Sequence, residues 1–467
     1  MRRLLAATCC VAAPRRRFVL KAGWPIPGPC LVWFGRAALA PSERPSDEDA
    51  VVPRLLPPGA SSDAALLLQT RGIRAFGDGL ISVVLAAYLA AVGLSDVRIG
   101  IVVTLTLLGS AGLTLAVGLR AHAYPRRRLL RLVSVLMIAT GVGFAVFSSF
   151  WPLALVGLIG TMNPNSGDVS VFLPTEQALL PATAPDAQRT ALFARYSLIG
   201  ALVAAVGALC AGVPEWVGDR LDVSASTSLR GAFIAYAVLG VVVLVRYRRL
   251  SPAVERVGEP PLRPLGASRR IVYRLAALFS LDAFGGGFVI TAMLVLWLQR
   301  RFGLSIAVAG AVFFWSGVLS AFSALVAVRI AHRIGLVRTM VFTHLPANLF
   351  LILTAFMPNA ALAVTCLLAR SMLSQMDVPA RTSYVMAVVA PAERPAAASV
   401  TNVPRSLASA LPPIAAGWML GQSTFGWPLI IGGALKALYD LLLLRQFRDI
   451  RPPEEVPVVN RPERPTR

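Results

Sequence analysis

Apolar residues recur along the chain in uncharged blocks of about 20, the length that an α-helix needs to cross a bilayer. A transmembrane strand would show only about ten residues of alternating polarity. Backbone groups in lipid must be paired within the spanning structure, so we expect helices. Twelve spans are predicted, near residues 71–92, 97–119, 129–149, 151–175, 190–213, 228–247, 271–298, 305–328, 336–357, 359–386, 396–420 and 425–447. The pattern predicts an all-α integral membrane protein.

Polar stretches divide these spans into two halves with tails. Residues 1–65 are rich in Arg and Pro, and we expect a disordered tail there, part of which is a candidate for a mis-assigned start. Residues 66–247 form a six-helix half, and 248–270 form a cytoplasmic linker. Residues 271–448 form the second half, and 449–467 a disordered cytoplasmic tail.

Short motifs repeat between the halves at offsets of about 205 to 210 residues. Phe-Gly-Asp-Gly at 76–79 corresponds to Phe-Gly-Gly-Gly at 284–287, and Pro-Thr-Glu at 174–176 to Pro-Ala-Arg at 379–381. A shared register over several motifs indicates two duplicated, pseudo-symmetric six-helix units. Within span four, Asn163, Pro164 and Asn165 interrupt the apolar run and predict a break in the helix.

The distribution of charged residues predicts how the protein is oriented in the membrane. Only 15% of residues are charged and 56% are hydrophobic, which argues against a soluble protein, although the net charge is +22. The arginines gather in alternate loops, after spans two, six and eight, and do not share one soluble face. This distribution argues against nucleic-acid binding and, by the positive-inside rule, places both termini in the cytoplasm.

The loops lack the motifs of known catalytic chemistry. They contain no nucleophile elbow, HExxH, Walker A or acidic metal motif, and the five cysteines and three histidines have no metal-ligand spacing. We therefore predict that the protein is not an enzyme and holds no metal and no cofactor, with the proton motive force as its energy source.

Between spans two and three, the sequence keeps part of the motif G-x-x-x-D-R-x-G-R-R. Gly118, Arg126 and Arg127 match it, whereas His122 replaces the Asp and Pro125 the second Gly; His332 stands at the Asp position of the second half. With twelve spans, two halves and a basic central loop, residues 66–448 resemble the major facilitator superfamily of secondary transporters. The general features are similar to those of bacterial drug-efflux members, so we expect the protein in the bacterial inner membrane.

Ionisable residues at membrane depth cost about 2.5–3.5 kcal/mol each, so they are candidate functional residues. The resemblance implies that spans one, four, seven and ten line a central cavity. We predict Asp78 as the proton-coupling carboxylate, because Gly77 and Gly79 leave room for close approach, with Asp168 as the second choice. The other predicted cavity residues are Asp282, Asp377 and Arg405. The predicted gate is a belt of ion pairs with neighbouring histidines, comprising Glu176, Arg381, Arg189, Arg394, His122 and His332.

The predicted function is secondary active transport of a small solute by alternating access, as proton-coupled efflux. Two alternatives remain open. One is an uptake symporter for an organic anion, which Arg370, Arg381 and Arg405 favour, and the other is a membrane sensor that does not transport. The expected partners are a small-molecule substrate and the lipid bilayer, without nucleic acid, and the expected state is a monomer.

Overall fold

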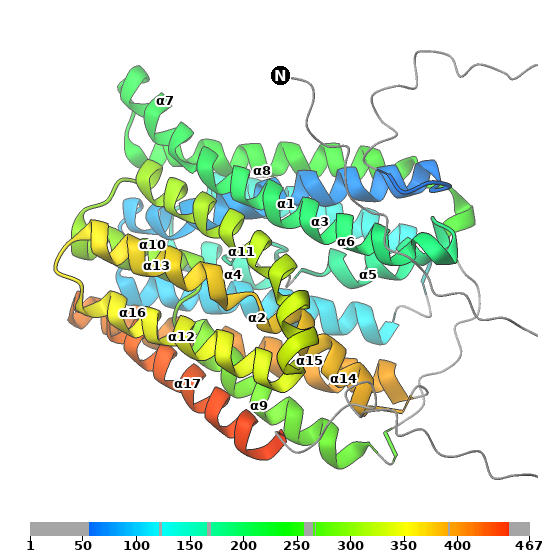
Figure 1. The fold of residues 1–467 in the computed structure, drawn as a ribbon. Helices are drawn as coiled ribbons and strands as arrows, with labels where there is room; N and C mark the ends of the chain where they lie inside the picture. The colour runs from blue at the N-terminus through cyan, green and yellow to red at the C-terminus, as the bar shows by residue number, and fades with distance from the viewer. Residues whose placement is uncertain are drawn as a thin grey trace, which may run out of the picture. The chain divides into compact units, whose positions relative to one another are not determined.

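A computed structural model describes residues 56–120, 124–165, 170–255, 265–266, 268–390 and 393–447. These residues form α-helices and short 3-10 helices, with no strand among them (Figure 1). Both predicted tails lie almost wholly outside the described residues, as do His122 and Asp168.

The first half contains eight α-helices. They are α1 (Ser62–Ala91), α2 (Asp96–Arg120), α3 (Arg126–Val146), α4 (Phe150–Ile159), α5 (Phe172–Leu179), α6 (Arg189–Leu209), α7 (Val213–Leu221) and α8 (Ala225–Arg248). The second half contains nine, namely α9 (Arg269–Gly287), α10 (Thr291–Phe302), α11 (Ile306–Ile334), α12 (Leu336–Phe356), α13 (Ala360–Ser374), α14 (Asp377–Val388), α15 (Arg394–Ala410), α16 (Pro412–Gln422) and α17 (Trp427–Phe447).

Nine helical stretches of the described residues are long and apolar enough to cross a membrane. The remaining predicted spans, four, ten and eleven, are each divided into two shorter helices: α4 and α5, α13 and α14, α15 and α16. The break predicted at Pro164 is confirmed. Spans seven, ten and eleven are also interrupted, at positions where the sequence predicted no break. Three glycines end α9 before α10 begins, and Pro412 and Pro413 start α16, where they cannot donate backbone hydrogen bonds to α15.

The broken spans of the two halves meet each other. The backbone N–H of Ala292, in the first turn of α10, donates to the carbonyl of Pro164 over 3.3 Å. The hydroxyl of Thr291 donates to the side-chain oxygen of Asn165, also over 3.3 Å. The first N–H groups of a helix have no partner within the helix, so the unwound part of span four supplies one for α10.

Glycines bring the first and fifth spans of each half into backbone contact. A Cβ added at Gly79 of α1 would lie 1.9 Å from the carbonyl oxygen of Ala204 in α6. At the corresponding place in the second half, a Cβ on Gly287 of α9 would lie 2.4 Å from the carbonyl oxygen of Ser409 in α15. The repeat therefore preserves a packing contact. The room that Gly79 leaves is occupied by a neighbouring helix, α6.

We expect Gly79→Ala to lower the free energy of unfolding by about 1–3 kcal/mol, because the added methyl group forces α1 and α6 apart. Thermal unfolding of the purified protein in detergent measures this loss. The matched control is Gly112→Ala in α2, where a Cβ meets no heavy atom within 4 Å. This substitution is expected to be neutral or stabilising, and equal losses in the two variants would contradict the packing role.

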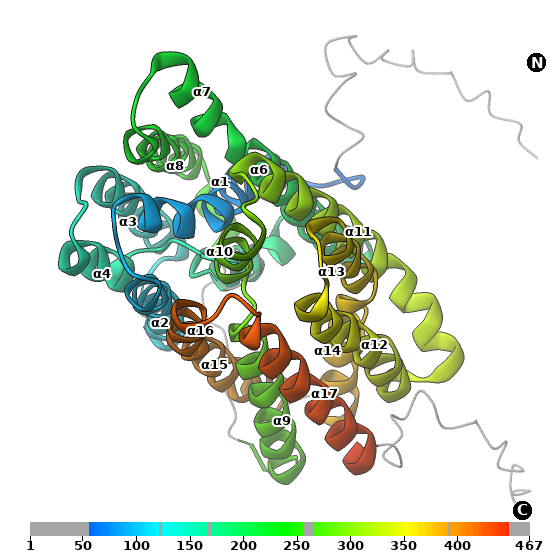
Figure 2. The same cartoon turned by 90° about the vertical axis from the view of Figure 1, so that its left-hand side faces the viewer.

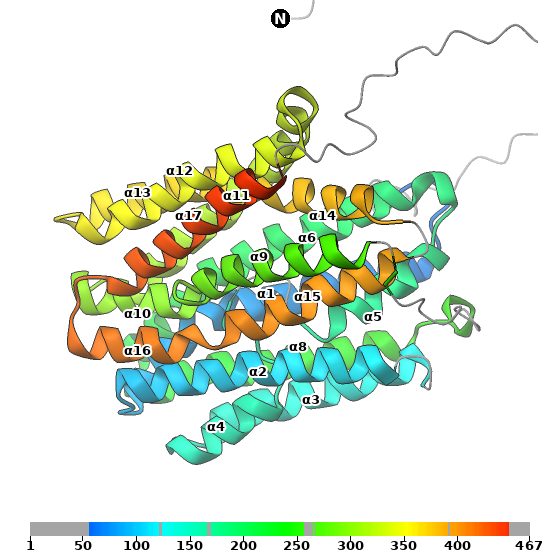
Figure 3. The ribbon, with the colours of Figure 1, turned by 90° about the horizontal axis from the view of Figure 1, so that it is seen from below.

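The two halves are closed together at the end that contains the α1–α2 and α10–α11 turns. α2 runs alongside α15 and α16 (Figure 3), and α6 alongside α11 (Figure 2). A Cβ on Gly417 would lie 2.3 Å from the carbonyl oxygen of Asp96, and the Asp96 side chain pairs with Arg300 at 2.7 Å. Apolar residues of α1 and α10 share one buried core there. Toward the opposite end, the second half has a separate apolar core, which includes Val272 and Phe447.

Candidate functional site

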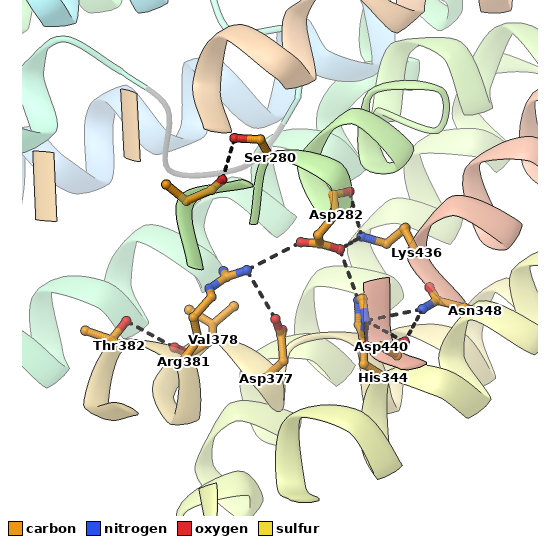
Figure 4. Close-up of polar contacts among 11 residues, drawn as sticks. Ser280, Asp282, His344, Asn348, Asp377, Val378, Arg381, Thr382, Lys436 and Asp440 are labelled. Carbon is orange, nitrogen blue, oxygen red and sulfur yellow. Dashed lines mark hydrogen bonds and ion pairs between the residues drawn. The ribbon is translucent and has the colours of Figure 1, made fainter. Parts of the chain in front are cut away.

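The buried carboxylate of Asp282, on α9, is the centre of a polar cluster in the second half (Figure 4). Lys436 of α17 pairs with it at 2.5 Å, and Arg381 of α14 at 3.4 Å. The Nε2 atom of His344, on α12, lies 3.8 Å from the same carboxylate. Four helices thus place three basic side chains around one acid, just before the glycines that end α9.

Two further acids extend this cluster. The Nδ1 atom of His344 is within hydrogen-bond distance of Asp440, at 2.9 Å, and the amide of Asn348 donates to Asp440 over 2.9 Å. Arg381 also pairs with Asp377, one helical turn away, at 3.3 Å. Figure 4 shows these groups converging from α9, α12, α14 and α17. We refer to Asp282, His344, Asn348, Asp377, Arg381, Lys436 and Asp440 as the second-half cluster.

A smaller cluster in the first half surrounds Glu176 of α5, which is fully buried. Glu176 forms an ion pair with Arg74 of α1 and accepts a hydrogen bond from the hydroxyl of Tyr196. Tyr247 donates to it over 2.5 Å and Thr70 over 2.9 Å. Side chains from α1, α6 and α8 therefore satisfy this carboxylate completely, as a buried charge requires.

The two clusters are related by the internal repeat, with their charges reversed. Arg74 and Asp282 occupy corresponding positions in spans one and seven, and Glu176 and Arg381 correspond in spans four and ten. Each half thus joins its first and fourth spans by an ion pair. The cation lies on the first span in one half and on the fourth span in the other. The duplicated scaffold preserves the pairing but not the polarity.

Asp78, the predicted proton-coupling residue, is buried on α1, one turn beyond Arg74. Among the described residues it has no hydrogen-bond or ion-pair partner. Its counterpart in the repeat is Gly286, and a Cβ at Gly286 would lie 3.7 Å from Nζ of Lys436. The first half therefore carries an acid where the second half leaves space beside a lysine.

The predicted belt of ion pairs is not formed in this conformation. Glu176 and Arg381 are buried and take their partners within their own halves, since a buried charge needs a close opposite charge. Arg189 pairs instead with the exposed Asp186 at 2.5 Å. Arg394 and His332 are exposed at helix ends and have no ion pair within the described part of the chain.

Arg370 and Arg405, two of the three arginines that favour an anionic solute, lie near the second-half cluster. Both side chains are half-buried, and both Nε atoms are buried with no hydrogen-bond partner. Neither forms an ion pair with any residue that the structure describes. Both nevertheless lie within electrostatic reach of Asp282.

Sequence reasoning did not assign His344, Asn348, Lys436 or Asp440 to the site. A signal was available, because His344 and Asn348 are four residues apart, as are Lys436 and Asp440. This spacing places each pair on one face of a helix, and polar faces at membrane depth indicate a buried partner. Only the packing of α12 against α17 shows that the two faces meet.

Comparison with known proteins agrees with this architecture. Residues 70–373 and 275–466 match the family model of the Major Facilitator Superfamily. The chain belongs to the Major Facilitator Superfamily. The predicted all-helical membrane fold is thereby confirmed, and membership indicates a multi-pass membrane transporter.

A relative of this superfamily member is the uncharacterized membrane protein YJR124C of Saccharomyces cerevisiae. The two are 24% identical over 423 residues, which cover 83% of this chain and 94% of the yeast protein. Among solved structures, a bacterial homolog of the human lysosomal transporter Spinster, inward-facing and occupied, aligns with a TM-score of 0.66 and 16% identity, over 83% of this chain and 97% of its own.

Two other superfamily structures are similar. The nucleoside transporter NupG aligns with a TM-score of 0.64 and 13% identity, over 83% of this chain and 99% of its own. The xylose transporter XylE from E. coli, in a partially occluded inward-open conformation, aligns with a TM-score of 0.63 and 13% identity, over 85% of this chain and 100% of its own. At these identities the likeness concerns the fold.

Proposed function

We propose that this protein moves a small solute across the membrane by alternating access and couples the movement to protons through Asp78. One observation carries the proposal: a carboxyl group is buried in a membrane-spanning helix with no hydrogen-bond or ion-pair partner among the described residues. An unpaired carboxylate is costly to bury, and protonation removes that cost. A site of this kind can take up a proton in one conformation and release it in another.

Within the described part of the chain, few charged and titratable groups lie near Asp78. Arg71 and Arg74 lie on the same helix and interact with it electrostatically, and Tyr236 faces it from α8. Arg74 is already paired with Glu176. Any rearrangement of α1 against α5 that separates this pair makes Arg74 available to Asp78 and favours loss of the proton. This exchange of partners is the proposed link between protonation and the movement of the halves.

The closed end of the described structure is proposed to face away from the cytoplasm. The loops rich in arginine lie at the opposite end, as the positive-inside rule requires of cytoplasmic loops. The Spinster homolog and XylE structures, which are inward-facing and partially occluded inward-open, offer a precedent for a state closed on the outer side. The inner bacterial membrane, the monomeric state and the export direction stay predictions.

Asp78→Asn tests the coupling. In proteoliposomes loaded with a pH-sensitive dye, we expect solute-driven proton movement to be lost in this variant. Solute counterflow is expected to persist, because Asn imitates the protonated acid and exchange needs no net proton transfer. The solutes used are glucose, uridine, succinate and ethidium, which cover neutral, anionic and cationic chemistry.

The matched control for this experiment is Asp186→Asn, which removes an exposed acid at the surface. It should leave both readouts unchanged. Full solute-driven proton movement in Asp78→Asn, with wild-type thermal stability, would refute the assignment. Binding of a solute without counterflow in the wild type would favour the sensor. Accumulation in everted vesicles energised by an inward proton gradient distinguishes export from import.

A further inference from the structure

Three hydrogen-bond donors beside the second-half cluster find no acceptor among the residues that the structure describes. The Nε atoms of Arg370 and Arg405 and the hydroxyl of Tyr439 are buried without a hydrogen-bond partner. Arg405 lies within electrostatic range of Tyr439 and of Arg381, which is also basic. Buried donors are normally satisfied, so a group of unsatisfied ones in one place needs an explanation.

Charge in this region is also unbalanced. Among the described residues, this region has four basic side chains besides His344, namely Arg370, Arg381, Arg405 and Lys436, and three acids, Asp282, Asp377 and Asp440. Basic groups therefore outnumber acidic groups in this part of the structure. All three acids are already held by Lys436, Arg381, His344 or Asn348. No acid in the cluster is left for Arg405.

We propose that the transported solute is an organic anion whose carboxylate, phosphate or sulfate group binds Arg405 and the hydroxyl of Tyr439, with Arg370 adding to the positive potential. This inference rests on the proposed transport function and names its substrate class. An oxyanion supplies the acceptors that the guanidinium and the hydroxyl lack, and charge-assisted hydrogen bonds of this type are strong. It also neutralises the repulsion between Arg405 and Arg381. Arg405 is half-buried and Tyr439 is fully buried, so an anion reaches the hydroxyl of Tyr439 only when the cluster opens, as alternating access would allow.

Thermal unfolding of the purified full-length protein tests the site without knowledge of the natural solute. The probes are sodium sulfate, sodium phosphate and sodium succinate, each balanced with sodium chloride to one ionic strength. Glucose and choline chloride are the neutral and cationic probes. We expect at least one oxyanion to raise the Tm by several degrees, with a half-maximal concentration that rises about tenfold in Arg405→Gln. Tyr439→Phe should weaken the same shift.

Arg329→Gln is the matched control, since it removes an exposed arginine of α11 and should leave the anion shift intact. If Arg405→Lys retains the anion-induced Tm shift that Arg405→Gln loses, a cation at position 405 is sufficient for anion binding.

The anion assignment is overturned if no oxyanion shifts the Tm, or if the shift is equal in Arg405→Gln and Arg329→Gln. It is also overturned if glucose or choline is transported with dependence on Asp78, which would leave the proposed proton-coupled transport intact. Conversely, an anion shift that depends on Arg405, together with unchanged proton movement in Asp78→Asn, supports the binding site and refutes the coupling residue.

Discussion

Replacing Glu176 with Ala is expected to lower the free energy of unfolding by about 3–5 kcal/mol, the range for removing one partner of a buried ion pair. The substitution leaves the buried guanidinium of Arg74 without its acid. It also removes the acceptor for the hydroxyl groups of Thr70, Tyr196 and Tyr247. Desolvated donors without an acceptor add to the loss.

Unfolding in detergent, followed by tryptophan fluorescence, measures this change. The control is Asp186→Ala, which breaks a surface pair with Arg189 and should cost at most about 1 kcal/mol. The double variant Arg74→Met with Glu176→Leu replaces the buried charges with apolar side chains and should recover the part of the loss that comes from the unpaired guanidinium, but not the part that comes from the hydroxyl groups. Similar costs for Glu176→Ala and Asp186→Ala would show that the first-half cluster does not stabilise the fold.

Replacing Asp282 with Asn is expected to cost a similar amount, about 3–5 kcal/mol, because it leaves a buried lysine with no acid. Arg381 still pairs with Asp377, and His344 still contacts Asp440. Lys436 is therefore the basic residue that loses its acidic partner. The ammonium of Lys436 then keeps two uncharged acceptors at position 282, the amide oxygen of the new side chain and the backbone carbonyl, which lies 3.5 Å away. This variant also separates the roles of the two halves, since Asp78 is untouched.

A double-mutant cycle with Lys436→Gln measures the pairing directly. If Asp282 and Lys436 stabilise each other, the double variant should be more stable than the sum of the two single losses predicts. Unfolding in detergent again supplies the values. Additive losses would mean that Lys436 is held by other groups. The cycle uses conservative replacements, so the packing of α9 against α17 at Gly285 and Gly432 is preserved.

The reversed polarity of the two clusters has a consequence for transport. In each half an ion pair joins the first and fourth spans, which the superfamily resemblance places around the central cavity. The two halves have the same helix arrangement, and in both an ion pair connects the first span to the fourth, although the charges are reversed. Beside the ion pair, each half has a different group without an ion-pair partner among the described residues. This group is the acid at position 78 in the first half and the arginines at positions 370 and 405 in the second half. The duplicated fold thus offers separate halves to the proposed proton site and the proposed anion site.

The sequence alone determined the membrane class, the two halves and their repeat. These follow from hydropathy and from turn residues, which are local properties, because each helix in lipid must pair its own backbone groups. The break at Pro164 was also predictable, since proline lacks the N–H that a continuous helix needs. The breaks in spans seven and ten were not, because nothing in their local sequence excludes a helix as strongly.

Only the tertiary structure decided the ion pairs. The partner of Asp282 is Lys436, 154 residues away, and Glu176 is 102 residues from Arg74. Charge patterns identified most of these residues as costly at membrane depth, but they did not show which helices face each other. For this reason the sequence predicted one belt of ion pairs among Glu176, Arg381, Arg189 and Arg394, whereas the structure has Glu176 and Arg381 in two separate buried clusters. A charge in a low-dielectric interior is stabilised by its nearest opposite charge, and which charge is nearest depends on helix packing.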